Sequence, residues 1–392
     1  MARRTVGAVS DPVARRRRSF LALIGLGIFN HTVLTGGRVT VALYALSQGA
    51  SPLIVGTLMG LYAFLPMLLA VAAGRLSDRM GVRRPMLVGS CGVMLGAMIP
   101  CLLPGLAPLF VATSMIGVSF MLFQISMQNA TGAFGPPSER ARNFSLLALG
   151  YSISLFGGPL TAGFLIDHAS FRTAFAVLAV LPLVPIVVLG RGMISLPGPH
   201  RAPATDAKGG LIELLSNARM RRVFIINGLL SMAWDLHSFF IPIYGAKIGL
   251  SASRIGVILA SFAVATFVVR LFMPRIAQRF SEFEVLTAAL FVAGSAFALF
   301  PFVEQIGVLM TLSFTLGLAL GSGQPMVMSL LYSMAPAGRM GEAAGLRMTI
   351  VNASTFAMPL LFGLVGSTLG LAPVFWTVGA ALGGAGILAR KR

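Results

Sequence analysis

The side chain that most suggests chemistry in this sequence is an acid within an apolar stretch. The chain has 11 Asp and Glu residues, and only Asp235 falls near the middle of a segment long and apolar enough to cross a membrane. Ser231 and Ser238 lie on the same predicted helix face as Asp235. An ionisable group inside a membrane is costly and commonly functional, and a carboxyl there can carry a proton. A structural acid paired with a neighbouring helix is the alternative.

A second polar stripe lies in the first apolar segment, at His31, Thr35 and Arg38. Each of these residues precedes a residue of the first stripe by 200 positions. We therefore predict that the two stripes face one cavity and that Asp235, His31 and Arg38 couple it to protons. His31 could instead bond a backbone carbonyl, and Arg38 could extend to the membrane surface.

Other polar side chains in the apolar segments are candidates for binding a small molecule, although each could equally bond helix to helix. Trp234 and His237 flank Asp235 on other faces, so we expect them to pack. Arg270 and Arg347 fall near segment ends, where we expect them to reach water. The candidate binding residues are Thr35, Gln124, Gln128, Tyr151, Ser152, Ser231, Ser238, Gln324 and Asn352.

These candidates belong to a chain whose halves repeat each other at a constant offset of 200 residues. The offset matches Arg, Gln, Tyr and Pro as well as Gly, which chance seldom produces. A duplication of this kind implies two parallel halves with a working site between them. The matched pairs include Tyr44 and Tyr244, Gly49 and Gly249, Ser51 and Ser251, Gly56 and Gly256, Gly117 and Gly317, Pro159 and Pro359, and Gly163 and Gly363.

Composition identifies an all-α membrane protein. The 392 residues are 56% apolar and 10% charged, with a mean hydropathy of +0.88, which no soluble core could accommodate. We predict six spans in each half, and hence a basic N-terminus (1–18), a first six-helix bundle (19–190), a linker (191–221), a second bundle (222–389) and a C-terminus (390–392). The predicted spans are 19–46, 52–73, 85–103, 106–130, 144–166, 171–190, 222–245, 252–273, 283–301, 306–332, 342–366 and 371–389.

The net charge of +19 would suggest nucleic acid in a soluble protein. Here nearly all Lys and Arg residues fall in alternate loops, while the opposite loops hold only Arg172, Lys247 and Arg254. This distribution is the positive-inside pattern, which predicts cytoplasmic termini, a cytoplasmic linker and no nucleic-acid partner. The first apolar segment lacks a cleavage site and is predicted to be an uncleaved helix.

Metal, cofactor and enzyme functions find no support in the motifs. Cys91 and Cys101 lie in one apolar segment without a partner His or a second Cys pair. The sequence shows no nucleophile and base pair and no phosphate-binding loop. We therefore predict no metal, no cofactor and no enzymatic activity.

The most specific local motif is the loop at residues 74–85, GRLSDRMGVRRP. It resembles the loop between helices 2 and 3 of the major facilitator superfamily, with Val82 as a small departure, and position and duplication extend the resemblance to the whole chain. The resemblance implies that Asp78 holds the cytoplasmic ends of the halves together, with Arg79 and Arg83 as charge partners and Gly74 and Gly81 for a tight turn. A purely topogenic role for the arginines is the alternative. The second copy has Gln278 in place of the acid.

A second motif, at residues 154–163, resembles the fifth-helix motif of proton-driven exporters in the same superfamily. Gly158, Pro159 and Gly163 carry the resemblance and imply a bendable helix, while Ala162 departs from it. Many of these exporters also carry an Arg on the fourth helix, where this chain has Thr113.

The resemblance implies a twelve-helix secondary transporter of a bacterial-type inner membrane that works by alternating access. We expect proton-coupled export of a small organic molecule by a monomer surrounded by membrane lipids. Uptake of a small organic anion with protons, with Arg38 binding the anion, is the alternative within this class. A membrane receptor or channel is the alternative from another class.

The lopsided charge predicts the labelling of single cysteines in a variant lacking Cys91 and Cys101. Tags at Ala50 and Thr368 should react with a membrane-impermeant thiol reagent added to intact cells, whereas a tag at Ala204 should not. The reverse pattern would overturn the predicted orientation.

Overall fold

A computed structural model describes residues 12–135, 139–196, 215–334 and 340–390, and the described chain contains α-helices and no strands. Some side chains within these helices, including those of Asp78 and Arg79, lie outside the described part. The helices of the first half are α1 (Pro12–Ser47), α2 (Pro52–Met80), α3 (Arg83–Leu102), α4 (Ala107–Ala133), α5 (Arg140–His168), α6 (Phe171–Val180) and α7 (Leu183–Gly190). Those of the second half are α9 (Ala218–Lys247), α10 (Ala252–Arg279), α11 (Glu282–Leu299), α12 (Ile306–Met334), α13 (Met340–Thr368) and α14 (Leu371–Arg390), with the short 3₁₀ helix η2 (Phe300–Phe302) after α11.

The described residues form 12 membrane-length apolar spans, one for each predicted segment, so the predicted fold class is confirmed. The sixth span is divided into α6 and α7, where Pro182 has no amide hydrogen to donate. Several helices continue beyond the predicted spans, because polar residues extend them past the apolar stretch. Thus α9 begins at Ala218, inside the predicted linker.

Several residues matched by the repeat occupy equivalent structural positions in the two halves. Ser51 caps α2 by accepting a hydrogen bond from the Ile54 amide, and Ser251 caps α10 in the same way. Gly49 and Gly249 precede these caps with φ of 77° and 75°, a backbone conformation that other residues rarely adopt. These equivalences show the duplication in three dimensions.

The two halves meet backbone to backbone at one end of the molecule. A Cβ added to Gly256 of α10 would lie 2.6 Å from the Pro159 carbonyl oxygen of α5, and one added to Gly56 of α2 would collide with the Pro359 carbonyl of α13. The 200-residue offset converts one contact into the other, because Gly56 matches Gly256 and Pro159 matches Pro359. We call the contact of α5 with α10 and the equivalent contact of α2 with α13 the two seams. Only glycine permits such close helix approach.

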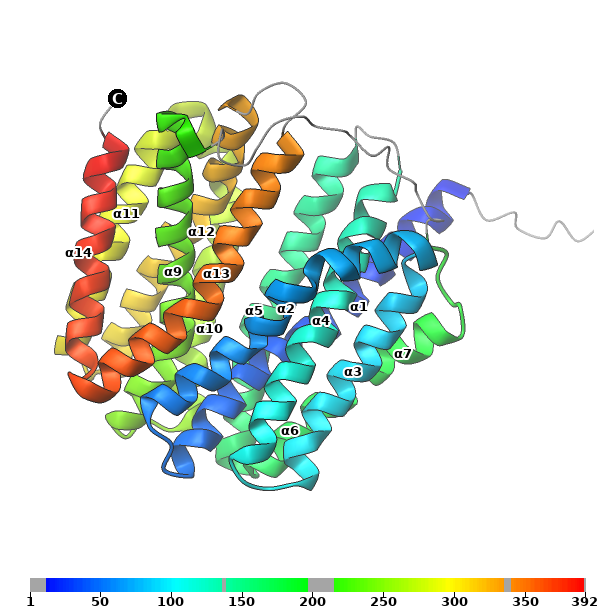
Figure 1. Ribbon diagram of the computed structural model, residues 1–392, viewed down its shortest axis with the longest axis horizontal. Helices are drawn as coiled ribbons and strands as arrows, with labels where there is room; N and C mark the ends of the chain where they lie inside the picture. Colours follow the sequence, from blue (N-terminus) through cyan, green and yellow to red (C-terminus); the bar gives the residue numbers. More distant parts are fainter. Residues whose placement is uncertain (1–11, 136–138, 197–214, 335–339, 391–392) are drawn as a thin grey trace, which may run out of the picture.

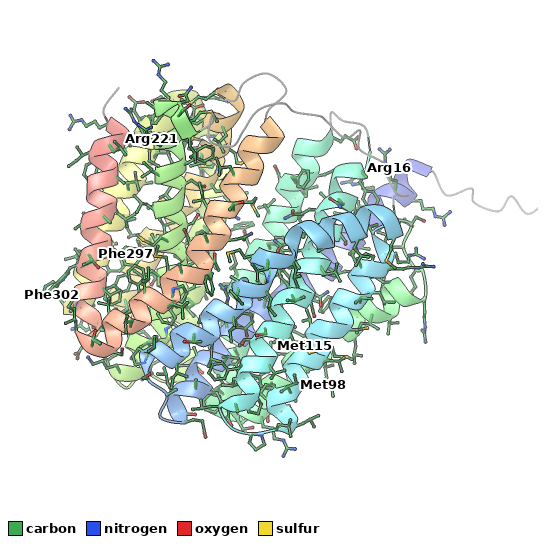
Figure 2. The ribbon with its side chains drawn as sticks, viewed as in Figure 1. Arg16, Met98, Met115, Arg221, Phe297 and Phe302 are labelled. Atoms are coloured by element: carbon green, nitrogen blue, oxygen red, sulfur yellow. The ribbon has the colours of Figure 1, made fainter. Side chains whose placement is uncertain are left out.

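Figure 1 shows α2 and α13 side by side at the lower end and apart at the upper end. We call the lower end, where α5 ends and α10 begins, the outer end, and the opposite end the arginine-rich end. Figure 2 places Arg16 and Arg221 at that upper, arginine-rich end, where α1 and α9 begin.

The seam predicts the effect of a single methyl group. Gly256→Ala should push α10 away from the Pro159 carbonyl at a cost of about 1–3 kcal/mol, as other overpacked sites do. Spin labels at the exposed His168 and Arg254 should then report longer distances between the outer ends of α5 and α10. Gly157→Ala is the control, because nothing lies within 4 Å of its added Cβ. Equal distances in both variants would exclude a tight seam.

Candidate functional site

A cavity of about 150 Å³ lies between the halves, among α1, α5, α9 and α10. His31, Thr35 and Arg38 line it from the first half, and Trp234, His237 and Ser238 line it from the second. Leu155, Pro159, Leu259, Phe262 and other apolar residues complete the wall. The predicted stripe of α1 therefore borders one cavity with part of the predicted stripe of α9.

Asp235 lies beside this cavity, half-buried, and faces the neighbouring helix α13. Its Oδ2 accepts a hydrogen bond of 2.8 Å from the Thr355 hydroxyl. The guanidinium of Arg38 is the cation whose charge acts on this carboxylate, although the two groups do not form an ion pair within 4.0 Å in the described chain. Asp235 therefore combines a short local bond with a longer-range electrostatic partner in the other half.

Arg38 lies in the cavity wall, and no described carboxylate is within 4.0 Å of it. Its guanidinium carbon lies 5.5 Å from the ring centroid of Tyr62 on α2, within the range of a cation–π interaction. The Arg38 Nε and the Tyr62 hydroxyl are both buried and have no hydrogen-bond partner among the described residues. A polar group entering between the halves could satisfy either one, since buried polar atoms ordinarily have partners.

His31 and His237 place an aromatic ring each at the cavity. His31 packs against Tyr151 and Phe120, with ring centroids 4.5 and 5.5 Å away. His237 stacks on Phe262 at 4.4 Å, with its Nε2 3.0 Å from the Ser313 hydroxyl. The Nδ1 atoms of both histidines lack a described partner.

Trp234 and His237 were expected only to pack, and the structure adds both to the cavity lining. For Trp234 the sequence spacing could have predicted this position, because Trp234 and Ser238 are one helical turn apart. In the structure the Ser238 hydroxyl bonds the Trp234 carbonyl at 3.2 Å. Ser238 thus stands between two faces of α9, one toward the cavity and one, with Asp235, toward α13.

The remaining predicted binding residues are not gathered at the cavity. Tyr151 packs on His31, and Ser152 is buried, with its hydroxyl bonded to the Ala148 carbonyl. Of the predicted binding residues, only Thr35 and Ser238 line the cavity in this conformation. Those that do not line it are Gln124, Gln128, Tyr151, Ser152, Ser231, Gln324 and Asn352, of which Gln324 is exposed.

Arg270 and Arg347 differ from the expectation that they reach water. Arg270 of α10 donates from Nη1 to the Ser152 hydroxyl of α5 at 3.1 Å and so joins the halves. Arg347 of α13 is only 8% exposed and contacts the Met348 sulfur. The reason is helix length: α10 continues to Arg279 and α13 begins at Met340, so both arginines lie roughly two turns inside the helices.

The predicted latch is described only in part. Gly81 ends α2 with φ of 73°, as a tight turn requires. Arg83 donates from Nη2 to the Ile194 carbonyl after α7, at 2.8 Å. All three remaining residues, Gly74, Asp78 and Arg79, belong to α2, but the side chains of Asp78 and Arg79 and the surroundings of Gly74 are outside the described part of the structure. The latch therefore stays a prediction.

The fifth-helix motif is a packing surface in this structure. A Cβ on Gly158 would meet the Gly36 amide nitrogen of α1 at 2.8 Å, and one on Gly163 would meet Ala252 of α10. Pro159 lies inside the continuous α5 and supplies the carbonyl that faces Gly256. Thr113 bonds the Phe110 carbonyl of its own helix and brings no charge to α4.

Asp167 lies at the outer end of α5, away from the middle of the span, and was not among the predicted site residues. Its carboxylate accepts the backbone amides of Ala252 at 2.9 Å and Ser253 at 2.7 Å, the first residues of α10. An anion is favoured at a helix N-terminus, so Asp167 links the two halves at their outer end. We call this contact of the Asp167 carboxylate with the Ala252 and Ser253 amides the Asp167 staple. The repeat indicates that this contact exists in one copy only. Ser367 matches Asp167 and has no carboxylate, and Pro52 matches Ala252 and has no amide hydrogen to donate.

A family model described as Major Facilitator Superfamily matches residues 19–282 and 223–391. The chain is 25% identical over 336 residues to the tetracycline resistance protein, class G, of Vibrio anguillarum, covering 83% of this chain and 84% of that protein. It is 19% identical over 371 residues to the quinolone resistance protein NorA of Staphylococcus aureus, covering 93% and 92%.

Solved transporter structures share the fold. A peptide transporter POT in complex with sulfate superimposes with a TM-score of 0.78 at 17% identity, covering 98% of this chain and 94% of that chain. The nucleoside transporter NupG, solved as a point mutant, gives 0.76 at 12% identity, covering 95% and 98%. At these identities the likeness concerns the fold alone.

The Asp167 staple predicts a local change in hydrogen exchange. Asp167→Ala should speed amide exchange at Ala252 and Ser253 about tenfold, since a charge-assisted bond of roughly 1.5 kcal/mol is lost. Ser367→Ala is the matched control, because among the described residues the Ser367 hydroxyl bonds the Leu364 carbonyl of its own helix and no residue of the other half. Unchanged exchange at the start of α10 would argue against the staple.

Proposed function

Because this chain belongs to the major facilitator superfamily, we propose that it exports a small organic molecule across the inner membrane in exchange for protons. The protein is a twelve-helix, multi-pass secondary transporter. The observation that carries the coupling mechanism is Asp235, an acid in mid-span that interacts with Thr355 of its own half and with the charge of Arg38 in the other.

Coupling follows from the position of these charges on opposite halves. An ionised Asp235 is attracted to Arg38, and the attraction grows as the halves bring the two groups together in a poorly solvated space. Protonation of Asp235 removes this attraction and leaves a neutral carboxyl bonded to Thr355. One proton therefore changes the relative stability of the two arrangements of the halves, as exchange transport requires.

The arrangement described here is closed at its outer end by the glycine seams and by Asp167. We assign it to the inward-facing side of the transport cycle, since the charge pattern predicts that the arginine-rich end is cytoplasmic. The central cavity of about 150 Å³ is smaller than the roughly 300–1,000 Å³ that drug-sized ligands occupy. Substrate binding therefore requires the halves to separate further around it.

The composition of the cavity favours an amphipathic, partly aromatic substrate. Trp234 and Phe262 meet edge to face at 4.8 Å and offer ring surface, while Arg38 and the two histidine Nδ1 atoms offer polar contacts. The names of the relatives, tetracycline and quinolone resistance proteins, support export and suggest planar ring compounds as first candidates.

Uptake of an organic anion is the alternative that one observation favours, namely the unpartnered Nε of Arg38. The direction of proton-driven movement separates the two. In everted vesicles with an acidic lumen, an exporter concentrates substrate inside, whereas a symporter releases it.

We predict that Asp235→Asn uncouples transport from protons. The amide retains the shape of the acid and a bond to Thr355 but cannot titrate. In everted vesicles supplied with tetracycline or a quinolone, the variant should exchange labelled substrate at near wild-type rates, yet lose at least tenfold of its accumulation under a proton gradient.

Two variants control for this result. Thr355→Val removes the local bond and keeps the acid, so it should retain gradient-driven transport with a shifted pH dependence. His31→Ala should reduce transport less than Asp235→Asn, because a neutral imidazole need not titrate. Wild-type accumulation by the Asn variant, with unchanged pH dependence, would refute Asp235 as the coupling residue.

A further inference from the structure

His237 is a buried polar side chain that the proposed coupling mechanism does not use. It is 1% exposed and lines the central cavity from α9. Its ring stacks on Phe262, and its Nε2 atom lies 3.0 Å from the Ser313 hydroxyl of α12. Its Nδ1 atom has no hydrogen-bond partner among the described residues. Because buried polar atoms ordinarily have partners, this nitrogen indicates a polar group that enters the cavity from outside the protein.

The surroundings of Ser313 determine which ring nitrogen of His237 carries the hydrogen. Ser313 is fully buried, and the imidazole is its one hydrogen-bond partner in the described chain. The carbonyl of Met310, one turn earlier in α12, already accepts the Ser261 hydroxyl of α10 at 3.1 Å. Ser313 therefore donates to Nε2, because its hydroxyl hydrogen would otherwise have no acceptor. A neutral imidazole that accepts at Nε2 carries its hydrogen on Nδ1, so His237 presents an N–H donor to the cavity.

The repeat shows that this pair of side chains belongs to the second half alone. Thr113 matches Ser313, and its hydroxyl bonds the Phe110 carbonyl of its own helix. Gly37 matches His237 and has no side chain to form such a bond. The first half maintains the same scaffold without the pair, so helix packing alone does not account for it.

Ring surface and a second donor surround the His237 N–H group. Phe262 lies against the imidazole, and Trp234 meets Phe262 edge to face at 4.8 Å. On the opposite wall, the Nε of Arg38 is a buried donor that also lacks a partner among the described residues. The Asp235 carboxylate is bonded to a hydroxyl of α13 and to neither of these donors. The cavity therefore complements a ring compound that supplies an acceptor oxygen.

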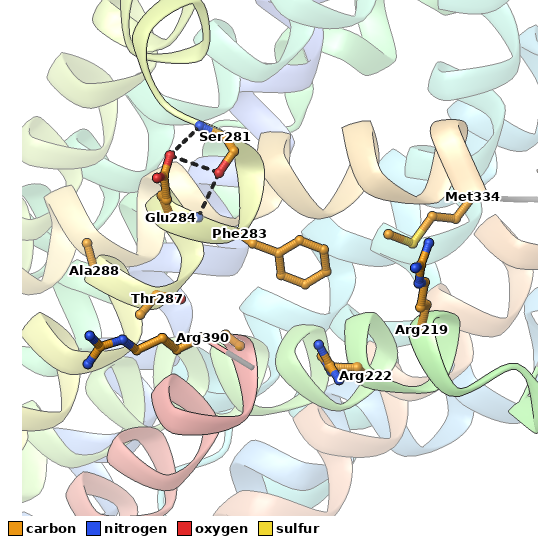
Figure 3. Close-up of a pocket in the computed structure, with 10 residues that line it drawn as sticks. Arg219, Arg222, Ser281, Phe283, Glu284, Thr287, Ala288, Met334 and Arg390 are labelled. Carbon is orange, nitrogen blue, oxygen red and sulfur yellow. Dashed lines mark hydrogen bonds between the residues drawn. The ribbon is translucent and has the colours of Figure 1, made fainter. Parts of the chain in front are cut away.

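A larger cavity, of about 660 Å³, lies at the arginine-rich end of the second half and contains no comparable atom (Figure 3). It opens among the ends of α9, α11, α12 and α14. None of its described lining residues has a buried side-chain nitrogen or oxygen without a partner. Figure 3 shows Arg390 pointing away from Arg219 and Arg222. The smaller central cavity is thus the one whose unpaired donors require a ligand.

We propose that His237 determines substrate specificity by donating a hydrogen bond from Nδ1 to a carbonyl oxygen on the ring system of the substrate. This inference rests on the proposed export of planar ring compounds and narrows them to ring ketones and related carbonyl compounds. Ser313 is a positioning residue, because it fixes the nitrogen that carries the hydrogen. A site built to bond an acceptor rejects an analogue that lacks it, since the buried donor is then left unpaired.

The fluorescence of Trp234 measures such binding in the cavity itself. The chain has 2 Trp residues, and Trp376→Phe removes the other, which is 46% exposed on α14. This parent protein, purified in lipid nanodiscs, is titrated with 1-indanone or indane, which differ by one carbonyl oxygen. At equal free aqueous concentrations, we expect 1-indanone to bind about tenfold more tightly, because indane leaves the His237 N–H group unpaired.

Variants of His237 separate the donor from the ring. His237→Phe keeps an aromatic ring against Phe262 and should abolish the preference for 1-indanone. His237→Asn places an amide N–H group near the position of Nδ1 and should retain the preference. A parent protein that binds neither compound, or both equally, would overturn the proposal, and so would an unchanged preference in His237→Phe.

The positioning role of Ser313 has its own test. Ser313→Ala should lower the preference, whereas Ser313→Thr keeps a hydroxyl, has the residue type of the matched Thr113 and should restore it. A loss in the Ala variant that the Thr variant does not restore would contradict this role. None of these titrations involves transport or a proton gradient, so their failure would leave the exchange tested by Asp235→Asn standing, and the reverse also holds.

Discussion

The close approach of backbones across the two seams is the constraint on which the rest of this structure depends. Gly256 faces the Pro159 carbonyl and Gly56 the Pro359 carbonyl, with no room for a methyl group. This contact brings α5 and α10 together at the outer end and thereby places Pro159 in the wall of the central cavity. It also brings the Asp167 carboxylate to the first amides of α10. Closure of the outer end and the shape of the cavity are thus consequences of one packing arrangement.

Symmetry and its absence divide the residues into two groups. Those that the repeat preserves, such as the caps Ser51 and Ser251, maintain the scaffold in both halves. Chemistry is concentrated where the repeat fails: Asp235 matches Thr35, and Arg38 matches Ser238. A duplicated scaffold supplies two equivalent helical bundles. The proposed proton coupling also requires an acid on one bundle and a cation on the other.

Electrostatics explains why these unequal charges lie on opposite halves. Thr355 holds Asp235 within the second half, while Tyr62 faces Arg38 within the first. In the proposed mechanism, rocking of the halves changes the separation of acid and cation without breaking their local contacts. Since the Coulomb energy rises as the separation falls and water leaves, a small movement is enough to make the charge of Asp235 matter to the equilibrium.

Hydropathy and the repeat determined the twelve spans and indicated that the α1 stripe and Ser238 of α9 border one cavity, because membrane length and helical period act locally along the chain. Only the tertiary structure showed that Asp235 turns to Thr355, that Arg270 reaches Ser152, and that Trp234 and His237 line the cavity. These outcomes depend on helix rotation and on how far polar residues extend each helix. The role of Asp167 could not be predicted from residue types because its partners are backbone amides. The difference between Pro52 and Ala252 is the one sign of it in the repeat. Such facts arise from neighbours far apart in the chain, and packing alone decides them.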